Sequence, residues 1–340
     1  MSDPSLNQPF ASLQQVLRER LTVLLEPLSP HLRADVECAF KEPGKLLFSS
    51  SSTTSGSTLP AGTWALLTLL VAQHVCPDID LAVATSVAVA VECFLCALDL
   101  LDDIEDHDHT PIVRQLGPAR VLNTSTTLLT LAHRALLSLQ ERGVSFACIL
   151  HLLDILQEAS LTATEGQHRD LLAEQQSATS FTQQECEAIA ADKAGALMRL
   201  ACLLGALCAG AEPEHSQLFA ELGMMLGIAH QLDNDAHDLE HELSQHSSSA
   251  ALIPVEAKKA DLARGKKTLP VILAAKEIPQ EHLSLSDEEK QEISLQALYD
   301  GILATWGVCL LYRERARDCL RKIEAKQPIS PALRELLGFT

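Results

Sequence analysis

Residues 81–108 join one long apolar segment to one dense acidic cluster. The apolar part reads LAVATSVAVAVECFLCAL, and the segment LDLLDDIEDHD, which shares its last leucine, carries six carboxylates in eleven residues. A helix that is apolar on every side either crosses a membrane or forms the centre of a large soluble bundle. Because Glu92 and Asp99 interrupt the run, we interpret it as a central bundle helix and expect no transmembrane segment.

The rest of the chain shows helical periodicity almost throughout. Apolar residues recur at three- and four-residue intervals, and the sequence contains no convincing alternating strand pattern and no repeat. The pattern predicts one all-α domain spanning residues 1–340, with a Ser/Thr/Gly-rich loop before residue 61. The predicted helices cover residues 7–26, 31–40, 61–73, 81–106, 118–140, 146–175, 183–208, 214–243, 269–275 and 287–323.

Composition limits the partners and the compartment. The chain has 340 residues, of which 47% are hydrophobic, and a net charge of −19. This charge argues against nucleic acid and anionic membrane surfaces as partners, because both select a basic footprint. The N-terminal segment MSDPSLNQPF lacks the basic and apolar regions of a signal peptide, and ten cysteines are spread along the chain. We therefore expect a cytoplasmic protein with reduced thiols.

The acidic cluster at the end of the first long helix has helical spacing. Asp99, Asp102 and Asp106 fall on one strip, with Asp103 beside it. Like charges at this spacing repel each other, and bound divalent cations would offset the repulsion. Carboxylate oxygens are the hard ligands that Mg²⁺ prefers. The alternative is a solvated helix end, although acids at a helix C-terminus also oppose the helix dipole.

A second acidic cluster, HQLDNDAHDLEHE at residues 230–242, again follows an apolar helical run. Asp235 and Asp238 are three residues apart, and Asn234, Asp238 and Glu242 recur every four. Two such clusters, each ending an apolar stretch of a long helix, predict a metal-lined cavity mouth. A diphosphate held between them would bridge the metal ions, which would neutralise its charge and make it a good leaving group.

Five segments resemble, in order, the motifs of trans-prenyl diphosphate synthases. LLDDIED resembles the DDxxD motif, EGQHRDL the GQxxD helix, and DKAGALM the lysine-threonine helix. HQLDNDAHD resembles the second aspartate-rich motif, with Asn234 in place of its first Asp, and DLARGKKTLPVILA resembles the GKxTLP segment. The resemblance implies the isoprenoid synthase fold (the class I terpenoid synthase fold), an all-α bundle around a central cavity.

The same resemblance implies roles for individual residues. It implies a site for three Mg²⁺ ions. The candidate metal ligands are Asp102, Asp103, Asp106, Asn234, Asp235, Asp238 and Glu242, and the five aspartates among them are also the candidate catalytic residues. The implied binding groups for the diphosphate and its pocket are Lys193, Lys266, Lys267, Gln167 and Gln231. Ordinary helix-surface polarity is the alternative interpretation of these lysines and glutamines. The family also implies a homodimer.

Two basic features of that family have no clear counterpart in the sequence. The family binds isopentenyl diphosphate through a basic GGKxxRP motif near the N-terminus and an Arg pair after DDxxD. The segment TSGSTLPAG aligns Pro60 with the proline of the motif, but Gly56 and Leu59 take the Lys and Arg places. After DDxxD the nearest arginines are Arg114 and Arg120. A second diphosphate should bind poorly in so acidic a chain, so we expect ionisation without chain elongation.

We therefore predict a class I isoprenoid diphosphate enzyme that ionises one allylic prenyl diphosphate and then cyclises or quenches the cation, as a terpene synthase does. Asn234, Asp238 and Glu242 match the spacing of the NxxxSxxxE triad of terpene cyclases, with Asp in the Ser place. The alternative is a prenyltransferase, which would either elongate with isopentenyl diphosphate or modify a peptide or another acceptor. DDIEDHDHTPIV, VLNTSTTLL, GQHRDL and KAGALM also resemble the competence-pheromone prenyltransferases, which modify a Trp in a peptide.

The length of the prenyl chain is predicted from the residues before DDxxD, which form the tunnel floor in this family. Ala97 is small and Phe94 lies about one turn deeper, so Phe94 is the candidate floor. We expect farnesyl or geranylgeranyl diphosphate as the substrate. Only 4% of the residues are aromatic, whereas aromatic faces usually stabilise a carbocation, which favours a linear or early-quenched product.

Overall fold

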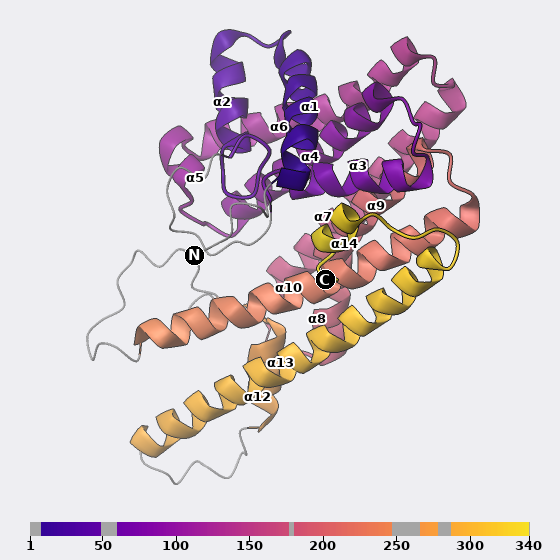
Figure 1. Ribbon diagram of the computed structural model, residues 1–340. Coiled ribbons are helices and arrows are strands. Elements are labelled where there is room, and N and C mark those ends of the chain that lie inside the picture. The colour runs from indigo at the N-terminus through magenta and orange to yellow at the C-terminus, as the bar shows by residue number, and fades with distance from the viewer. Residues whose placement is uncertain (1–7, 49–59, 177–179, 247–265, 278–286, 340) are drawn as a thin grey trace. The chain divides into compact units, whose positions relative to one another are not determined.

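The computed structural model describes residues 8–48, 60–176, 180–246, 266–277 and 287–339, and every regular element within these ranges is helical (Figure 1). The all-α prediction is confirmed. The α-helices are α1 Gln8–Leu25, α2 Pro30–Phe40, α3 Thr63–Val75, α4 Leu81–Glu105, α5 Pro111–Leu116, α6 Pro118–Leu137, α7 Phe146–Ala173, α8 Gln183–Ala190, α9 Ala196–Cys208, α10 Pro213–His246, α12 Leu269–Glu277, α13 Asp287–Glu324 and α14 Pro331–Leu336.

The chain divides into two compact units. Unit 1 comprises Met1–Glu158, Arg199–Ala220 and Cys319–Thr340. Unit 2 comprises Ala159–Met198 and Glu221–Asp318. The expectation of one domain over residues 1–340 stays a prediction.

α4 is the central helix of unit 1. Its apolar residues are mostly Val and Ala, small enough to let neighbours pack on all sides, and α3 and α6 make its main contacts. Asp80 caps the helix by accepting a hydrogen bond from the Ala82 N–H at 2.9 Å. By length and composition alone α4 could cross a membrane, but 83% of its most apolar stretch is buried inside the protein. The burial agrees with the interpretation of α4 as a central bundle helix.

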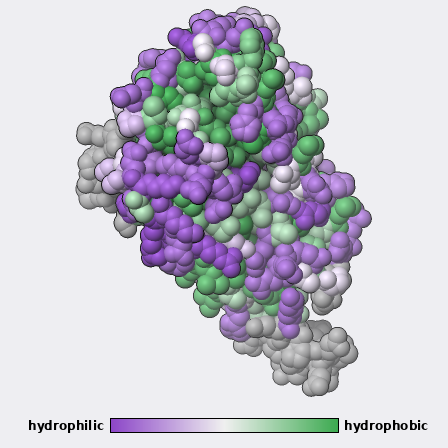
Figure 2. Space-filling model, turned by 90° about the vertical axis from the view of Figure 1, so that its right-hand side faces the viewer, coloured by the Kyte–Doolittle hydropathy of each residue, from purple (hydrophilic) through white to green (hydrophobic). Residues whose placement is uncertain are grey.

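Two other helices, α7 and α13, are also long and apolar enough to cross a membrane. They bury only 28% and 33% of their most apolar stretches. Phe146 and Leu161 of α7 and Leu303 and Leu310 of α13 are mostly exposed. The face in Figure 2 carries apolar patches among hydrophilic side chains. The absence of a transmembrane segment therefore stays a prediction.

The structure differs from the predicted helices in three places. The predicted helix over residues 183–208 contains one turn of π-helix at Ala191–Gly195, between α8 and α9. The short helices α5 and α14 were not predicted, because six residues are too few to show a period of 3.6. The C-terminal part of the predicted helix 118–140 is a 3₁₀ turn at Ser138–Arg142.

Candidate active site

The first acidic cluster lies where α4 ends in unit 1. Asp106 is the C-cap, and His107 follows with a φ of 57°, the left-handed conformation that glycine usually adopts at this position. The His107 N–H bonds to the Ile104 carbonyl at 3.2 Å, and the Asp108 N–H bonds to the Asp103 carbonyl at 2.8 Å. These two bonds form a Schellman motif, which fixes the backbone turn directly after the acidic residues.

The carboxylates at this end differ in burial. Asp106 and Asp108 are only 4% and 5% exposed, whereas Asp102 and Asp103 are half-buried. The Thr110 hydroxyl donates to Asp103 Oδ2 at 3.0 Å, which orients that carboxylate as supporting residues orient metal ligands. Burying a carboxylate costs free energy unless cations or hydrogen bonds compensate it. This burial argues against a freely solvated helix end, and metal binding at this cluster stays a prediction.

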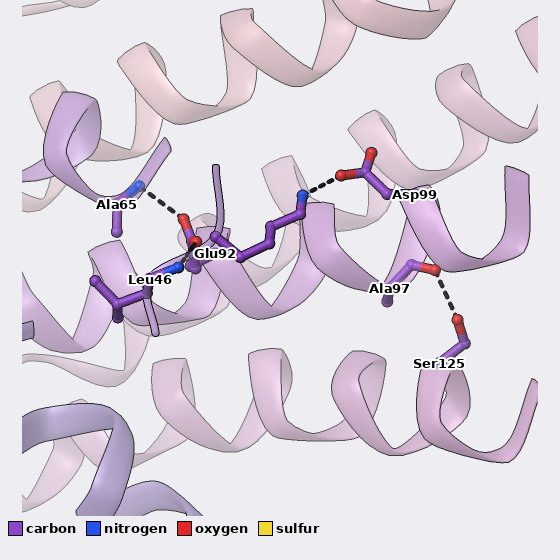
Figure 3. A network of polar contacts seen from close by, with 7 residues as sticks. Leu46, Ala65, Glu92, Ala97, Asp99 and Ser125 are labelled. Carbon is purple, nitrogen blue, oxygen red and sulfur yellow. Dashed lines mark hydrogen bonds and ion pairs between the residues drawn. The ribbon is translucent and has the colours of Figure 1, made fainter. Parts of the chain in front are cut away.

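A lysine reaches α4 one turn before this cluster. Lys45 Nζ contacts Asp99 Oδ2, with side chains that are 11% and 53% exposed. Glu92, deeper on α4, accepts hydrogen bonds from the backbone N–H groups of Leu46 and Ala65, each at 3.1 Å (Figure 3). Burial raises the pKa of Glu92, opposed by Lys45 and the two N–H groups. Burial alone would lower the pKa of Lys45, but Asp99 and Glu92 raise it above its usual value, so Lys45 is a cation.

Sequence reasoning missed Lys45. The segment GKLLF at residues 44–48 fits the Gly-Lys-x-x-Arg part of the basic family motif, with Phe48 in the Arg place. The predicted alignment at Gly56 and Leu59 lies outside the described residues, and Pro60 lies just before α3. The Gly-Lys pair, searched without requiring the proline, would have found this segment.

The two arginines after the first cluster have other partners. Arg114 Nε donates to the His109 carbonyl at 2.7 Å, and Arg120 Nε donates to Asp35 Oδ2 at 2.9 Å. Both arginines have exposed side chains. These contacts agree with the expectation that the basic site for a second diphosphate is altered in this chain.

The second acidic cluster lies on α10 in unit 2. One face of α10 is buried in a cluster of apolar side chains, formed in this region by Leu232, Ala236, Leu239 and Leu243. The adjacent, half-buried face carries Gln231, Asp235, Asp238 and Glu242. Their spacing of four, three and four residues is that of one helix face. Asn234, four residues before Asp238, lies at the exposed edge of this face, with its amide 3.4 Å from His230 Nε2. Its role as a metal ligand stays a prediction.

Lys193, the lysine of the segment DKAGALM, lies on the π turn between α8 and α9. Lys193 Nζ pairs with Asp170 of α7 at 2.8 Å, and the neighbouring Asp192 pairs with Arg169. Two adjacent residues of α7 thus pair, in the same order, with two adjacent residues of the turn. π turns are frequent at functional sites because the extra residue redirects side chains. Here the turn directs Asp192 and Lys193 toward α7.

Three glycines let α7, the π turn and α10 approach one another closely. A Cβ on Gly166 would lie 2.9 Å from Asp192 Cβ, and one on Gly227 would lie 2.3 Å from the Ala194 carbonyl oxygen. A Cβ on Gly195 would lie 2.7 Å from Met224 Sδ. Side chains at these positions would separate the helices. The glycines therefore bring Lys193 of the turn next to the acidic helix α10.

The predicted glutamines and the other lysines lie in the same unit. Both side-chain polar atoms of Gln167 are buried and have no hydrogen-bond partner among the described residues, which is the state of a group poised for a ligand. Gln231 instead donates to Asp235 Oδ1 at 2.9 Å and so orients that carboxylate. Lys266 and Lys267 are half-buried just before α12, and Lys267 Nζ donates to the Glu174 carbonyl at 3.4 Å.

The pKa of a buried cysteine, Cys186, responds to the carboxylates at this end of unit 2. Cys186 Sγ donates to the Lys267 carbonyl at 3.2 Å. Burial, together with the nearby carboxylates of Asp235 and Asp170, raises the pKa of Cys186 to about 12. Cys186 is therefore a neutral thiol. The aspartates of α7 and α10 both act on it, so the GQxxD helix, the π turn and the second acidic cluster are neighbours in space.

The predicted tunnel residues are in the core of unit 1. Phe94 is 1% exposed and Ala97 is fully buried on α4, where the Ala97 carbonyl accepts a bond from Ser125 at 2.7 Å. Their role in limiting the prenyl chain stays a prediction. In unit 2, the Tyr312 hydroxyl donates to Glu187 at 2.6 Å.

The carboxylates of the two acidic clusters are suitable ligands for Mg²⁺, but in the part of the chain that the structure describes they do not by themselves form a complete coordination shell. Among the described residues, no three His, Cys, Asp or Glu side chains converge as a ready metal site. Mg²⁺ commonly uses one or two carboxylates and completes its shell with water and substrate phosphate oxygens. Carboxylates spaced along one helix face, with Asp103 and Asp235 each held by a neighbouring donor, suit that mode of binding.

Comparison with known proteins places this arrangement in a family. The family model for polyprenyl synthetase matches residues 63–301, and the chain belongs to this family. A decaprenyl diphosphate synthase from Rhodobacter capsulatus aligns with a TM-score of 0.72 over 98% of this chain and 96% of that one, at 20% identity. The isoprenoid synthase fold predicted from the motifs is therefore confirmed.

Two relatives indicate the range of chemistry in the family. A tryptophan prenyltransferase, ComQ, from Bacillus spizizenii is 29% identical over 185 residues, which cover 54% of this chain and 56% of the relative. The match thus spans little more than half of that relative. A geranylfarnesyl diphosphate synthase from Aeropyrum pernix is 27% identical over 284 residues, which cover 80% of this chain and 86% of the relative.

Proposed function

We propose that this chain is a Mg²⁺-dependent prenyltransferase. Its donor would be an allylic prenyl diphosphate, farnesyl or geranylgeranyl diphosphate, and its acceptor a nucleophile other than isopentenyl diphosphate. The observation that carries the donor is the end of unit 2 where the π turn with Lys193 packs closely on α7, which carries the buried Gln167 amide, and on α10, the helix of the second acidic cluster. A cation, an amide and carboxylates for metal ions are the groups that a diphosphate needs.

Mg²⁺, when bound, would neutralise the diphosphate and make it a better leaving group. The candidate ligands are those predicted from the sequence, in unit 1 Asp102, Asp103 and Asp106, and in unit 2 Asp235, Asp238 and Glu242, with Asn234 as a neutral oxygen donor. The family typically uses this metal. The predicted number of three ions is part of the proposal.

The protein's own groups would act on the leaving diphosphate and on the cation. The Lys193 ammonium, with Lys266 and Lys267, stabilises the charge that develops on the diphosphate as the C–O bond breaks. Apolar side chains around the prenyl group exclude water, so that the allylic cation survives until the acceptor attacks. The acceptor forms a bond to C1 of the prenyl group and then loses a proton.

The choice of acceptor rests on two observations. The tryptophan prenyltransferase is 29% identical to this chain over 185 residues, which makes an indole or another uncharged nucleophile a suitable acceptor class. The lysine of the basic segment, Lys45, is already paired with Asp99. Chain elongation is the second candidate, because the geranylfarnesyl diphosphate synthase matches 80% of the chain.

Cyclisation, the outcome expected from the sequence, stays a prediction. The relatives are prenyltransferases and prenyl diphosphate synthases, which fit the alternative better. A cytoplasmic homodimer likewise stays a proposal, which analytical ultracentrifugation of the purified chain and fractionation of its source would test.

The test is an incubation of the purified chain with Mg²⁺ and geranyl, farnesyl or geranylgeranyl diphosphate. Each donor is supplied alone, with isopentenyl diphosphate, and with a Trp-containing peptide. Diphosphate release is followed, and products are identified by mass spectrometry. A prenylated peptide supports the proposal, a longer diphosphate establishes elongation, and a hydrocarbon or alcohol from the donor alone establishes a terpene synthase. Absence of diphosphate release in every mixture would refute the proposed donor chemistry.

A further inference from the structure

The backbone around Lys45 is fixed on both sides. Gly44 has a φ of 80°, and its carbonyl accepts a hydrogen bond from the Gly62 N–H at 2.8 Å. On the other side, the Leu46 N–H bonds to the buried Glu92 carboxylate at 3.1 Å. Because both neighbours are held, the Lys45 side chain has little freedom to turn away from α4. Its charge is a permanent feature of this part of unit 1.

Asp99 stands between this charge and the solvent. The Lys45 side chain is 11% exposed, whereas the Asp99 side chain that contacts it is 53% exposed. Glu92 already accepts two backbone hydrogen bonds, so Asp99 is the carboxylate that forms the ion pair with Lys45. Figure 3 shows Glu92 and Asp99 along the same helix. The Lys45 ammonium forms its ion pair with Asp99. An anion from solution would have to replace the Asp99 carboxylate to reach Lys45.

Replacing Asp99 would be unfavourable for a second phosphorylated substrate. The displaced carboxylate lies one turn from Asp102 and Asp103, so an entering diphosphate would add charge beside three aspartates. An intramolecular carboxylate also binds without the translational entropy that a free ligand loses. The Asp99 carboxylate therefore takes the place at Lys45 that the phosphate of a ligand would otherwise occupy.

We infer that Asp99 is a specificity-determining residue that keeps a second phosphorylated substrate away from Lys45. It thereby leaves the prenyl group to an acceptor without a diphosphate. This inference rests on the proposed function, in which the acceptor is not isopentenyl diphosphate. The role of Asp99 would explain that choice of acceptor. Its physical content is a binding property of Lys45 and Asp99, which is measurable without turnover.

The experiment is calorimetric titration of isopentenyl diphosphate into the full chain with Mg²⁺, with and without saturating inorganic diphosphate to occupy the donor site. Asp99→Ala and the isosteric Asp99→Asn should each bind isopentenyl diphosphate at least about tenfold more tightly than the wild type, because the competing carboxylate is removed. The double variant Lys45→Met/Asp99→Ala should lose the gain. Asp35→Ala, which removes an equal charge from the ion pair with Arg120, is the matched control and should bind like the wild type.

Thermal unfolding of each variant establishes that it is folded. Affinity of the folded Asp99→Asn protein within twofold of the wild type would overturn the inference. A gain that persists in the double variant would also overturn it, since the site would not be Lys45. If the wild type releases no diphosphate from any allylic donor, the proposed function fails, but these titrations still decide whether Asp99 blocks Lys45.

Discussion

The two units each place a lysine in an ion pair beside an acidic helix, but they hold it in different ways. In unit 1, Lys45 lies on an irregular segment and is secured by Glu92, a buried carboxylate bonded to two backbone N–H groups. In unit 2, Lys193 lies on a π turn between helices that touch at glycines. The position of Lys45 therefore depends on buried hydrogen bonds to Glu92, whereas the position of Lys193 depends on close helix packing.

The difference extends to the partners of the two lysines. Asp99, the partner of Lys45, is half exposed, while Asp170, the partner of Lys193, is only 20% exposed and lies beside a second ion pair, Arg169–Asp192. Gln167, with both polar atoms unpaired among the described residues, belongs to unit 2. Both lysines are thus paired with a carboxylate, and unit 2 differs in adding a buried amide on α7, the helix that pairs with its lysine.

The largest expected effect is loss of turnover on removing a carboxylate from either acidic cluster. Asp102→Ala in unit 1 and Asp235→Ala in unit 2 should each lower diphosphate release by about 10²–10³-fold or more, because each would lose a ligand for the metal that stabilises the leaving group. Steady-state kinetics of diphosphate release measures the effect, with Asp35→Ala as the control. Full activity of one variant would show that its cluster does not take part.

Phe94→Ala should have the next largest effect. Removing a fully buried phenyl ring costs about 3–5 kcal/mol of the free energy of unfolding. If Phe94 is the tunnel floor, the variant should also accept a longer prenyl diphosphate than the wild type. Phe40→Ala, which removes an equally buried ring from α2 of unit 1, should be destabilised without a change in chain length. An unchanged chain-length preference in Phe94→Ala or Phe94→Leu would contradict the assignment.

Gly227→Ala should test the packing of unit 2. The added Cβ would lie 2.3 Å from the Ala194 carbonyl oxygen, so the backbone of α10 or of the π turn must move. We expect a loss of about 1–3 kcal/mol in the free energy of unfolding and a weaker hold on the donor, seen as a higher KM. Gly307→Ala on α13 meets no atom within 4 Å and should stabilise the protein by about 0.5–1 kcal/mol. Equal effects of the two substitutions would refute the close approach at Gly227.

The smallest expected effect is a pH dependence with opposite signs in the two units. Burial raises the folded-state pKa of Glu92 above its reference value of 4.5, so its stabilising contribution is fully present below that pH and is lost as the pH rises through the folded-state pKa. The free energy of unfolding of the wild type should therefore fall relative to Glu92→Gln as the pH rises. The expected change is about 1.4 kcal/mol for each unit by which the pKa is raised.

Glu185 of unit 2 provides the contrast. Its hydrogen bonds from Thr182 lower its pKa, so its contribution is present above pH 4.5 and is lost as the pH falls through the folded-state pKa. The difference between wild type and Glu185→Gln should therefore change in the opposite direction. Urea unfolding between about pH 3 and pH 8 measures both differences. Parallel slopes for the two variants would contradict the assigned burial of Glu92.

Local pattern predicted most of the helices and the residues that carry chemistry. α4 was expected at residues 81–106 and lies at Leu81–Glu105, and α10 was expected at residues 214–243 and lies at Pro213–His246. These predictions succeeded because a long amphipathic or apolar helix repeats its signal over many turns. The order of the acidic and lysine motifs led to the correct family for the same reason, since each motif lies within a few consecutive residues.

The π turn, its two ion pairs with α7 and the Lys45–Asp99 pair were not predicted. A single extra residue within a helix leaves the apolar pattern over residues 183–208 almost unchanged, so the turn at Ala191–Gly195 is invisible to periodicity. Lys45 and Asp99 are 54 residues apart, and nothing local relates them.

The sequence by itself determined the helices, the two acidic clusters and the family, because each follows from residues close together in the chain. Only the tertiary structure decided which carboxylate pairs with each lysine, which glutamine lacks a partner among the described residues and which face of α10 carries the carboxylates. These properties depend on which side chains meet after the helices have packed. Packing brings together residues whose separation in the sequence carries no information about their contact.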